Sequence, residues 1–243
     1  MIMSFYQQIA PYYHHIFKIN DKQIEFVTLK LPAIDSKLLD IGCGIGTLSL
    51  ALSSYFQDIT GIDMDPEMIR VAKTKEIGIS KSVQFHVESM LKLEAFTDKN
   101  SIDGIVCFGN TLVHLSSLDE IADFLQQSKT VLKTNGKLLM QIVNYDKVIK
   151  KNIRQLPTIE NDEITFERNY DYRSNENKVI FNTRLTVRST QQVIKNSIQL
   201  IPVLKKELTG LLSKAGFDHY NFYGNFNQED YSVDSPALIV EAW

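Results

Sequence analysis

The sequence predicts an α/β protein built on a doubly wound parallel sheet, with a small antiparallel insertion late in the chain. Three observations support this prediction. Short apolar runs alternate with helical patterns through the first two-thirds of the 243 residues. A glycine-rich turn directly follows the first of these runs. Between residues 155 and 201, apolar residues recur at every second position, which is typical of antiparallel strands with one buried face.

Five short segments are expected to form the core strands of the sheet. They lie at Lys37–Ile41, Asp58–Asp63, Val83–Val87, Ile102–Cys107 and Lys137–Val143. Because helical segments separate them, we expect right-handed crossover connections and a parallel arrangement.

Capping residues mark the boundaries of two helices in this region. Asp65-Pro66-Glu67 combines an N-cap, a first-turn proline and an acid near the positive end of the helix dipole, and predicts a helix through Ala72. Ser117–Glu120 is a capping box that begins the second helix. Its buried stripe extends to Leu132, and we expect Thr134-Asn135-Gly136 to end it.

The segment 155–201 is predicted to form the antiparallel insertion. Alternating residues at Glu163–Arg173 and Val179–Val187 flank a turn at Asn175–Asn177, and Gln191–Ile201 adds a third strand. Residues 1–154 and 202–243 then form the main domain, which a helix over Leu204–Ala215 and strands near 218–224 and 236–242 complete. We expect the insertion to be a substrate lid or a homodimer contact.

Composition excludes several classes of protein. The chain has 26 basic and 29 acidic side chains and a formal net charge of −3, so no nucleic-acid partner is expected. No apolar run approaches the roughly 18 residues that span a bilayer, and residues 1–6 lack the basic start and apolar core of a secretory signal. Two cysteines, Cys43 and Cys107, are too few for a disulfide scaffold. We therefore expect a cytoplasmic protein without membrane association.

The most informative segment is the glycine-rich turn after the first strand. Glycines at positions 42, 44 and 46 lead into a helix, which is typical of a nucleotide-binding turn. Glycine lets the backbone approach a ligand, and the helix N-terminus offers free N–H donors. Asp63, about twenty residues further on, ends the second strand and is placed to bind ribose hydroxyls. A tight turn that binds nothing is the structural alternative.

Asp40 distinguishes between the nucleotide ligands. A dinucleotide-binding turn requires its third glycine where this chain has Thr47. The Asp40 carboxylate stands two residues before Gly42, and two like charges ~4 Å apart repel by about 4 kcal/mol at an effective dielectric near 20. Asp40 therefore opposes a pyrophosphate. It suits S-adenosylmethionine, which has amino and sulfonium cations, an adenosine and no phosphate.

These segments resemble the class I S-adenosylmethionine-dependent methyltransferases, and the resemblance covers nearly the whole chain. Asp40–Gly46 resembles the first motif of that family, with glycines at Gly42, Gly44 and Gly46, and Gly61–Ile69 resembles the second. The resemblance implies a Rossmann-like sheet of seven strands. It also implies that Asp63 binds the ribose and that Met64 packs on the adenine.

The residues after the third strand depart from the family pattern. An Asp usually stands there and contacts the adenine amino group, whereas this chain has Ser89. The resemblance leaves Ser89, Glu88 or the backbone of Met90 to make that contact.

The N-terminal stretch Ile9–Phe17 resembles the Ala-x-x-Tyr-Asp-x-x-Phe lid segment of the family. Tyr13 takes the place of the tyrosine, and His14 replaces the Asp. The resemblance implies that Tyr13 closes over the carboxylate or methionine arm of the cofactor. A core aromatic residue on an amphipathic helix is the alternative.

Cys107–Leu115 leaves the fourth strand at the edge of the sheet where ligands bind. It resembles the corresponding segment of glycine and sarcosine N-methyltransferases, and of small-molecule N-methyltransferases generally. The resemblance implies that the Phe108 backbone contacts the cofactor amino group, while Asn110 and His114 face the methyl donor. A structural histidine is the alternative.

Further candidates for contacting the substrate lie later in the chain. Asn144 leaves the fifth strand toward the same edge. Arg168 and Tyr170 in the insertion offer a guanidinium and an aromatic ring for a substrate carboxylate or ring. The alternative for these two is an exposed strand face with a solvated arginine.

The predicted function is methyl transfer from S-adenosylmethionine to a small molecule, with nitrogen as the preferred acceptor. A neutral amine needs alignment and exclusion of water but no dedicated base. An oxygen acceptor more often needs one, and His114 is the nearest candidate. Clustered metal ligands are absent from the sequence, so no metal is expected. The alternatives are methylation of RNA or protein, a nicotinamide-dependent oxidoreductase, and a non-catalytic protein that binds S-adenosylmethionine.

Overall fold

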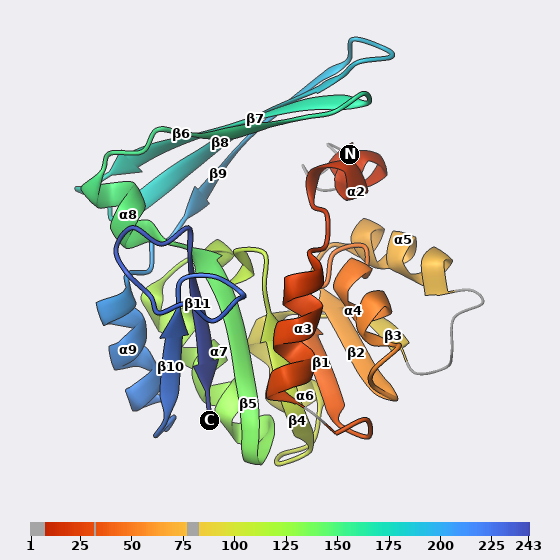
Figure 1. Ribbon diagram of the computed structural model, residues 1–243, viewed down its shortest axis with the longest axis vertical. Helices are drawn as coiled ribbons and strands as arrows, with labels where there is room; N and C mark the ends of the chain where they lie inside the picture. Colours follow the sequence, from red (N-terminus) through yellow and green to blue (C-terminus); the bar gives the residue numbers. More distant parts are fainter. Residues whose placement is uncertain (1–7, 32, 77–82) are drawn as a thin grey trace.

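The computed structural model describes residues 8–31, 33–76 and 83–243, and seven of its strands form one twisted sheet (Figure 1). The strand order is β10-β11-β5-β4-β1-β2-β3; β11 runs antiparallel to β10 and β5, and the remaining neighbours pair in parallel. These strands are β1 (Lys37–Ile41), β2 (Asp58–Asp63), β3 (Val83–Val87), β4 (Ile102–Cys107), β5 (Leu132–Val143), β10 (Tyr220–Tyr223) and β11 (Ala237–Ala242). The predicted α/β fold and its seven strands are therefore confirmed. Residues 1–6, where a secretory signal was sought, lie outside the described residues.

Helices cover both faces of this sheet, as a doubly wound fold requires. The principal helices are α3 (Asp21–Lys30), α4 (Thr47–Leu52), α5 (Pro66–Glu76), α6 (Leu93–Phe96), α7 (Leu118–Val131) and α9 (Lys205–Lys214). Phe26 of α3 belongs to one buried cluster and Phe124 of α7 to another. Successive strand residues alternate between the two clusters, so Ile105 belongs to the cluster of Phe124 and Val106 to the cluster of Phe26.

The end of α7 differs from the prediction. The helix ends at Val131, before the expected stop at Thr134-Asn135-Gly136. Leu132 is buried, as predicted, but it has extended backbone angles and pairs with Ile102 as the first residue of β5. The register between β4 and β5 shifts after this pair, so the glycine turn lies inside the strand rather than at the end of the helix. Strand pairing across the sheet thus overrides the local stop signal.

The insertion forms a separate antiparallel sheet with one strand more than predicted. Its order is β6 (Gln155–Glu160), β7 (Ile164–Arg173), β8 (Lys178–Val187) and β9 (Val193–Leu200). β6 is an edge strand that contains Pro157 and has no buried residue, so it lacks the alternating pattern that marks the other three. A short helix before it, α8 (Tyr145–Lys150), was also not predicted.

This four-stranded sheet forms a roof over the end of the main sheet at which the parallel strands terminate (Figure 1). At one end, β9 contacts the short helix η3 (Thr111–His114), and the Ile201 amide donates to the Val113 carbonyl at 3.0 Å. At the other end, Ile9 and Ile16 of the N-terminal segment pack against Phe166 of β7. The roof therefore encloses the edge of the sheet where ligands bind in folds of this kind.

A buried ion-pair network joins α3 to the far side of the main sheet. Glu241 of β11 is only 2% exposed, and its carboxylate contacts Lys30 at 2.8 Å and Lys137 at 2.6 Å. Tyr223 donates a hydrogen bond to the same carboxylate at 2.9 Å. Burial alone would raise the pKa of Glu241, but the hydrogen bonds from Lys137 and Lys30 lower it to about 2.

Among the described residues, no helix is long and apolar enough to cross a bilayer.

Candidate active site

The glycine loop is held in a conformation that larger residues do not adopt. Gly42, Gly44 and Gly46 all have positive φ angles of 67°, 55° and 75°. At Gly46 an added Cβ would lie 2.4 Å from Cζ of Phe85, so this position excludes any side chain. At Gly44 an added Cβ would lie 3.0 Å from Oη of Tyr13, so the tyrosine predicted as a lid lies directly against the loop.

Asp63 fixes the loop from the end of β2. Its Oδ2 accepts a hydrogen bond from the Gly44 amide, and its Oδ1 accepts one from the Asp65 amide, both at 2.9 Å. Burial raises the pKa of Asp63 despite these two hydrogen bonds. Each carboxylate oxygen has a second lone pair, so the side chain can still accept hydrogen bonds from a ligand.

Asp40 is a buried carboxylate, and its hydrogen-bond partner is a neutral hydroxyl. It is 4% exposed, and the hydroxyl of Ser49 donates to it at 2.5 Å. Burial, together with the negative charge of Asp63, raises the pKa of Asp40 to about 7 in spite of that hydrogen bond. No lysine or arginine pairs with it in the part of the chain that the structure describes. The site therefore favours a positively charged ligand next to Asp40.

Asp40 faces a small cavity at the glycine loop. The cavity has a volume of about 110 Å³, and Tyr13, Phe17 and Phe108 contribute aromatic walls to it. The hydroxyl oxygen of Thr47 lies in its wall, is buried, and has no hydrogen-bond partner among the described residues. The volume is below the roughly 300 Å³ of common small-molecule pockets, so it suits one charged arm of a ligand and not a whole nucleoside.

The residues predicted to contact adenine lie outside this cavity. Met64 is 70% exposed at the end of β2. Ser89 caps the short helix η2 (Met90–Lys92), because its hydroxyl accepts a hydrogen bond from the Leu91 amide at 3.2 Å. Glu88 accepts a hydrogen bond from the Ser89 amide at 2.8 Å, and Met90 is buried. Their contacts with adenine stay predictions.

The segment after β4 brings two predicted substrate contacts to the edge of the sheet. Asn110 has a positive φ of 70°, accepts a hydrogen bond from the Val143 amide at 2.9 Å and donates one to Oη of Tyr145 at 3.1 Å. His114 remains exposed to solvent, yet the surrounding protein desolvates the imidazole and lowers its pKa. Neither contact with a substrate has been tested, so both stay predictions.

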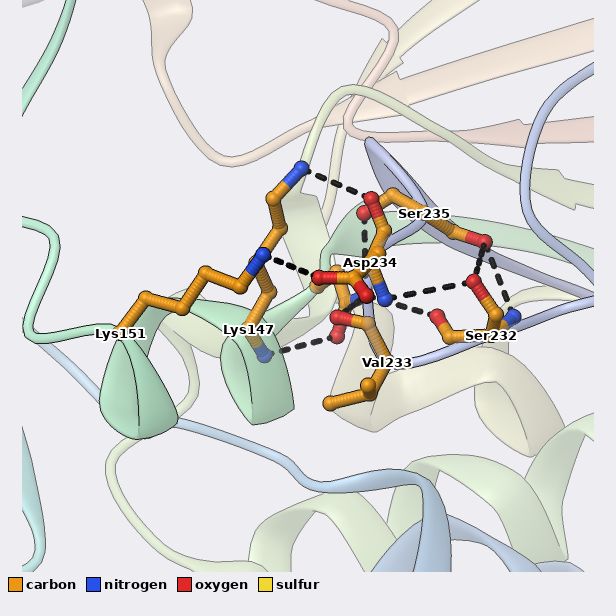
Figure 2. Close-up of polar contacts among 7 residues, drawn as sticks. Lys147, Lys151, Ser232, Val233, Asp234 and Ser235 are labelled. Atoms are coloured by element: carbon orange, nitrogen blue, oxygen red, sulfur yellow. Dashed lines mark hydrogen bonds and ion pairs between the residues drawn. The ribbon is translucent and has the colours of Figure 1, made fainter.

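Asn144 has a structural role that sequence reasoning missed. Its side-chain amide donates to the carbonyls of Ser232, Val233 and Ser235 at 3.0–3.2 Å, and its oxygen accepts from the Tyr231 hydroxyl at 2.9 Å. Figure 2 shows the loop 232–235 that it anchors, together with Lys147 and Lys151, which contact Asp234. The amide is fully used in this way, so nothing observed supports a contact between Asn144 and a substrate.

Arg168 and Tyr170 lie on the inner face of the roof. Tyr170 is 5% exposed, and its ring centroid is 6.3 Å from that of Tyr145. Arg168 donates to the Pro157 carbonyl at 2.7 Å through Nη2, while its Nε is buried and has no hydrogen-bond partner among the described residues. They therefore do not belong to an exposed strand face. Their contact with a substrate and the role of the insertion as a lid or dimer contact stay predictions.

In the described ranges, no three metal-ligating side chains cluster.

Comparison with known proteins shows that part of this chain is similar to methyltransferases. Residues 38–136 match a methyltransferase domain family. The ubiquinone biosynthesis O-methyltransferase of Xanthomonas axonopodis pv. citri (strain 306) is 27% identical over 129 residues. That match covers 52% of this chain and 51% of the relative, so it spans about half the length of each.

Solved structures share the fold over nearly the full length of the chain. The CcbJ methyltransferase from Streptomyces caelestis superposes with a TM-score of 0.85 at 16% identity, over 99% of this chain and 97% of that one. An amino pentose methyltransferase from Micromonospora echinaspora, determined with bound S-adenosylmethionine, superposes with a TM-score of 0.69 at 14% identity. This match covers 100% of this chain and 98% of that one. The predicted resemblance to S-adenosylmethionine-dependent methyltransferases is confirmed at the level of the fold and the matched domain. The glycine and sarcosine subtype stays a prediction.

Proposed function

We propose that this chain transfers a methyl group from S-adenosylmethionine to a small-molecule acceptor, with nitrogen as the preferred acceptor atom. The observation that carries the proposal is the buried Asp40 carboxylate, which faces the cavity of the glycine loop and pairs with no lysine or arginine of the described ranges. A cationic ligand supplies the missing charge, whereas a diphosphate would add a like charge at the same place.

The residues at the glycine loop fit S-adenosylmethionine. Asp40 suits the positive charge of the methionine arm, and the unpartnered hydroxyl of Thr47 offers a hydrogen bond in the same cavity. Asp63 retains acceptor capacity for ribose hydroxyls. When bound, the cofactor supplies an electrophilic methyl carbon on a sulfonium.

The protein contributes alignment and exclusion of water. Methyl transfer requires the acceptor atom in line at roughly 3–3.5 Å, which is a demand on positioning. Tyr13 and Phe17 border the cavity from the N-terminal segment, and the antiparallel sheet covers the same edge. A poorly solvated site favours the neutral form of an amine, so nitrogen needs no dedicated base. A protein of the same fold is named an amino pentose methyltransferase, so small molecules that bear an amino group are among the acceptors to test.

Oxygen is the second candidate acceptor, and two observations favour it. Desolvation lowers the pKa of His114, which favours the neutral imidazole, the form that can accept a proton from a hydroxyl. The Xanthomonas relative is an O-methyltransferase.

Cofactor binding and acceptor screening test the proposal. Titration calorimetry should detect S-adenosylmethionine and S-adenosylhomocysteine, and labelled methyl groups should pass from the former to members of a panel of amino sugars and secondary amines. A panel of phenols tests oxygen as the acceptor. If oxygen is methylated, His114→Gln should reduce the rate of methyl transfer to phenols by roughly a hundredfold or more, while its rate of transfer to amines stays within about threefold of the native rate.

Each alternative has its own result. Binding of NADH without binding of S-adenosylhomocysteine would indicate an oxidoreductase and overturn the proposal. Tight cofactor binding without any transferred label would indicate a non-catalytic binding protein. Label found only in RNA or in protein would move the acceptor to a macromolecule.

A further inference from the structure

The inner face of the roof has a row of polar side chains whose buried atoms have no partners. Arg168 of β7 is in register with Thr183 of β8, and Thr183 is in register with Asn196 of β9. Nε of Arg168, Oγ1 of Thr183 and Nδ2 of Asn196 are all buried and lack hydrogen bonds among the described residues. Most buried polar groups in proteins are paired, so three unpaired groups in one row indicate a missing partner.

The face on which the row lies follows from its neighbours. Side chains two residues apart on a strand share a face, and Phe166 and Tyr170 flank Arg168 on β7. The Phe166 ring lies 6.4 Å from that of Phe17, which borders the cavity of the glycine loop. The Tyr170 ring lies near Tyr145, whose hydroxyl accepts a hydrogen bond from Asn110. The row therefore lies between the lid segment and the edge of the main sheet.

The chemistry of the row selects the partner. Arg168 and Asn196 present N–H donors, and the hydroxyl of Thr183 can donate as well, so a ligand must bring acceptor atoms. Arg168 also has no carboxylate partner in the described ranges, although its guanidinium is partly buried. Because a desolvated cation needs a counter-charge, the missing group is an anion.

We infer that the row of Arg168, Thr183 and Asn196 binds a carboxylate of the methyl acceptor and holds the acceptor beneath the roof. The inference rests on the proposed function and defines its substrate class as small molecules that carry a carboxylate. The aromatic rings of Tyr145, Tyr170 and Phe181 stand beside the row and suit an apolar or ring-bearing body on the same molecule.

Titration calorimetry with benzoate and its neutral isostere benzamide tests the inference on the protein saturated with S-adenosylhomocysteine. We expect benzoate to bind at least about tenfold more tightly than benzamide, since a charge-assisted hydrogen bond contributes this much. Arg168→Gln should abolish the preference. Arg184→Gln is the matched control, because Arg184 is an exposed neighbour on β8 that pairs with Glu167 on the outer face.

A second measurement needs no ligand. Thr183→Val removes an unpaired buried hydroxyl while keeping its shape, so the unfolding midpoint of the free protein should stay the same or rise. If ordered water satisfies the row instead, Thr183→Val should lower that midpoint, and benzoate and benzamide should bind alike. Equal binding of the two probes, or an unchanged preference in Arg168→Gln, would overturn the inference. Failure to bind S-adenosylhomocysteine would refute the proposed function separately, and the two probes then decide the role of the row on the free protein.

Discussion

Asp40→Asn should stabilise the free protein and weaken its binding of S-adenosylmethionine. Burial raises the pKa of Asp40 from 3.8 to about 7, so the folded state holds a proton that the unfolded state releases. As pH rises through this interval, the unfolded state is increasingly favoured, and the full cost applies above pH 7. At about 1.4 kcal/mol per pKa unit, a shift of roughly three units sets an upper limit of about 4 kcal/mol.

The expected gain in the free energy of unfolding of Asp40→Asn is smaller than that limit, because the new amide is still buried. Asparagine keeps a hydrogen bond with Ser49 but leaves part of its amide without a partner, so we expect a gain of about 2 kcal/mol at pH 8. Because the cost of the buried amide does not change with pH, the gain should fall to near zero at pH 5.5, and at pH 4 and below the variant should be less stable than the native protein.

The assay is urea denaturation of both proteins at pH 5.5 and pH 8, with calorimetric titration of S-adenosylmethionine at the higher pH. Asp58→Asn is the matched control, because Asp58 is an exposed carboxylate at the start of β2. Affinity for the cofactor should fall roughly tenfold to a hundredfold in Asp40→Asn, since the counter-charge is lost. A variant that is less stable than the native protein at pH 8, or a gain that does not change with pH, would refute this reasoning.

Urea denaturation tests three further sites, Gly46, Glu241 and Asn144, each against a second substitution. Gly46→Ala should lower the free energy of unfolding by about 3 kcal/mol, because its Cβ would collide with the phenylalanine of β3. Gly109→Ala shares the positive φ but meets open space, so it should cost only about 1 kcal/mol, and equal losses would contradict the steric argument. Glu241→Gln should cost about 3–5 kcal/mol at pH 7 because two lysines lose their counter-charge, whereas Glu25→Gln in an exposed pair should cost below about 0.5 kcal/mol. The contribution of Glu241 to the free energy of unfolding is fully present above its unfolded pKa of 4.5 and should be lost as pH falls toward 2. If the native protein and Glu241→Gln differ in stability by the same amount at pH 7 and pH 3, this explanation is refuted. Asn144→Asp should cost about 2–4 kcal/mol and exceed the cost of Asn144→Ala, because a carboxylate oxygen would face three carbonyls. A more stable aspartate variant would refute that role.

Much of the fold could be predicted because its signals are local. The apolar strands, the capping residues at Asp65 and Ser117 and the glycine turn each depend on a few adjacent residues, and the structure has each of them where expected. β6 could not be predicted, because an edge strand with no buried residue has no periodic pattern. The early end of α7 was also missed, since the pairing of Leu132 with Ile102 involves residues thirty positions apart.

The sequence by itself determined the kind of ligand at the glycine loop, through the spacing of three glycines, Asp40 and Asp63. Only the tertiary structure decided which polar groups have partners. Asn144 and Arg168 looked alike in the sequence as polar residues near one edge. The amide of Asn144 is saturated by a loop about ninety residues later, whereas Nε of Arg168 has no partner in the part of the chain that the structure describes. Hydrogen-bond satisfaction depends on contacts between distant segments, and no local pattern encodes them.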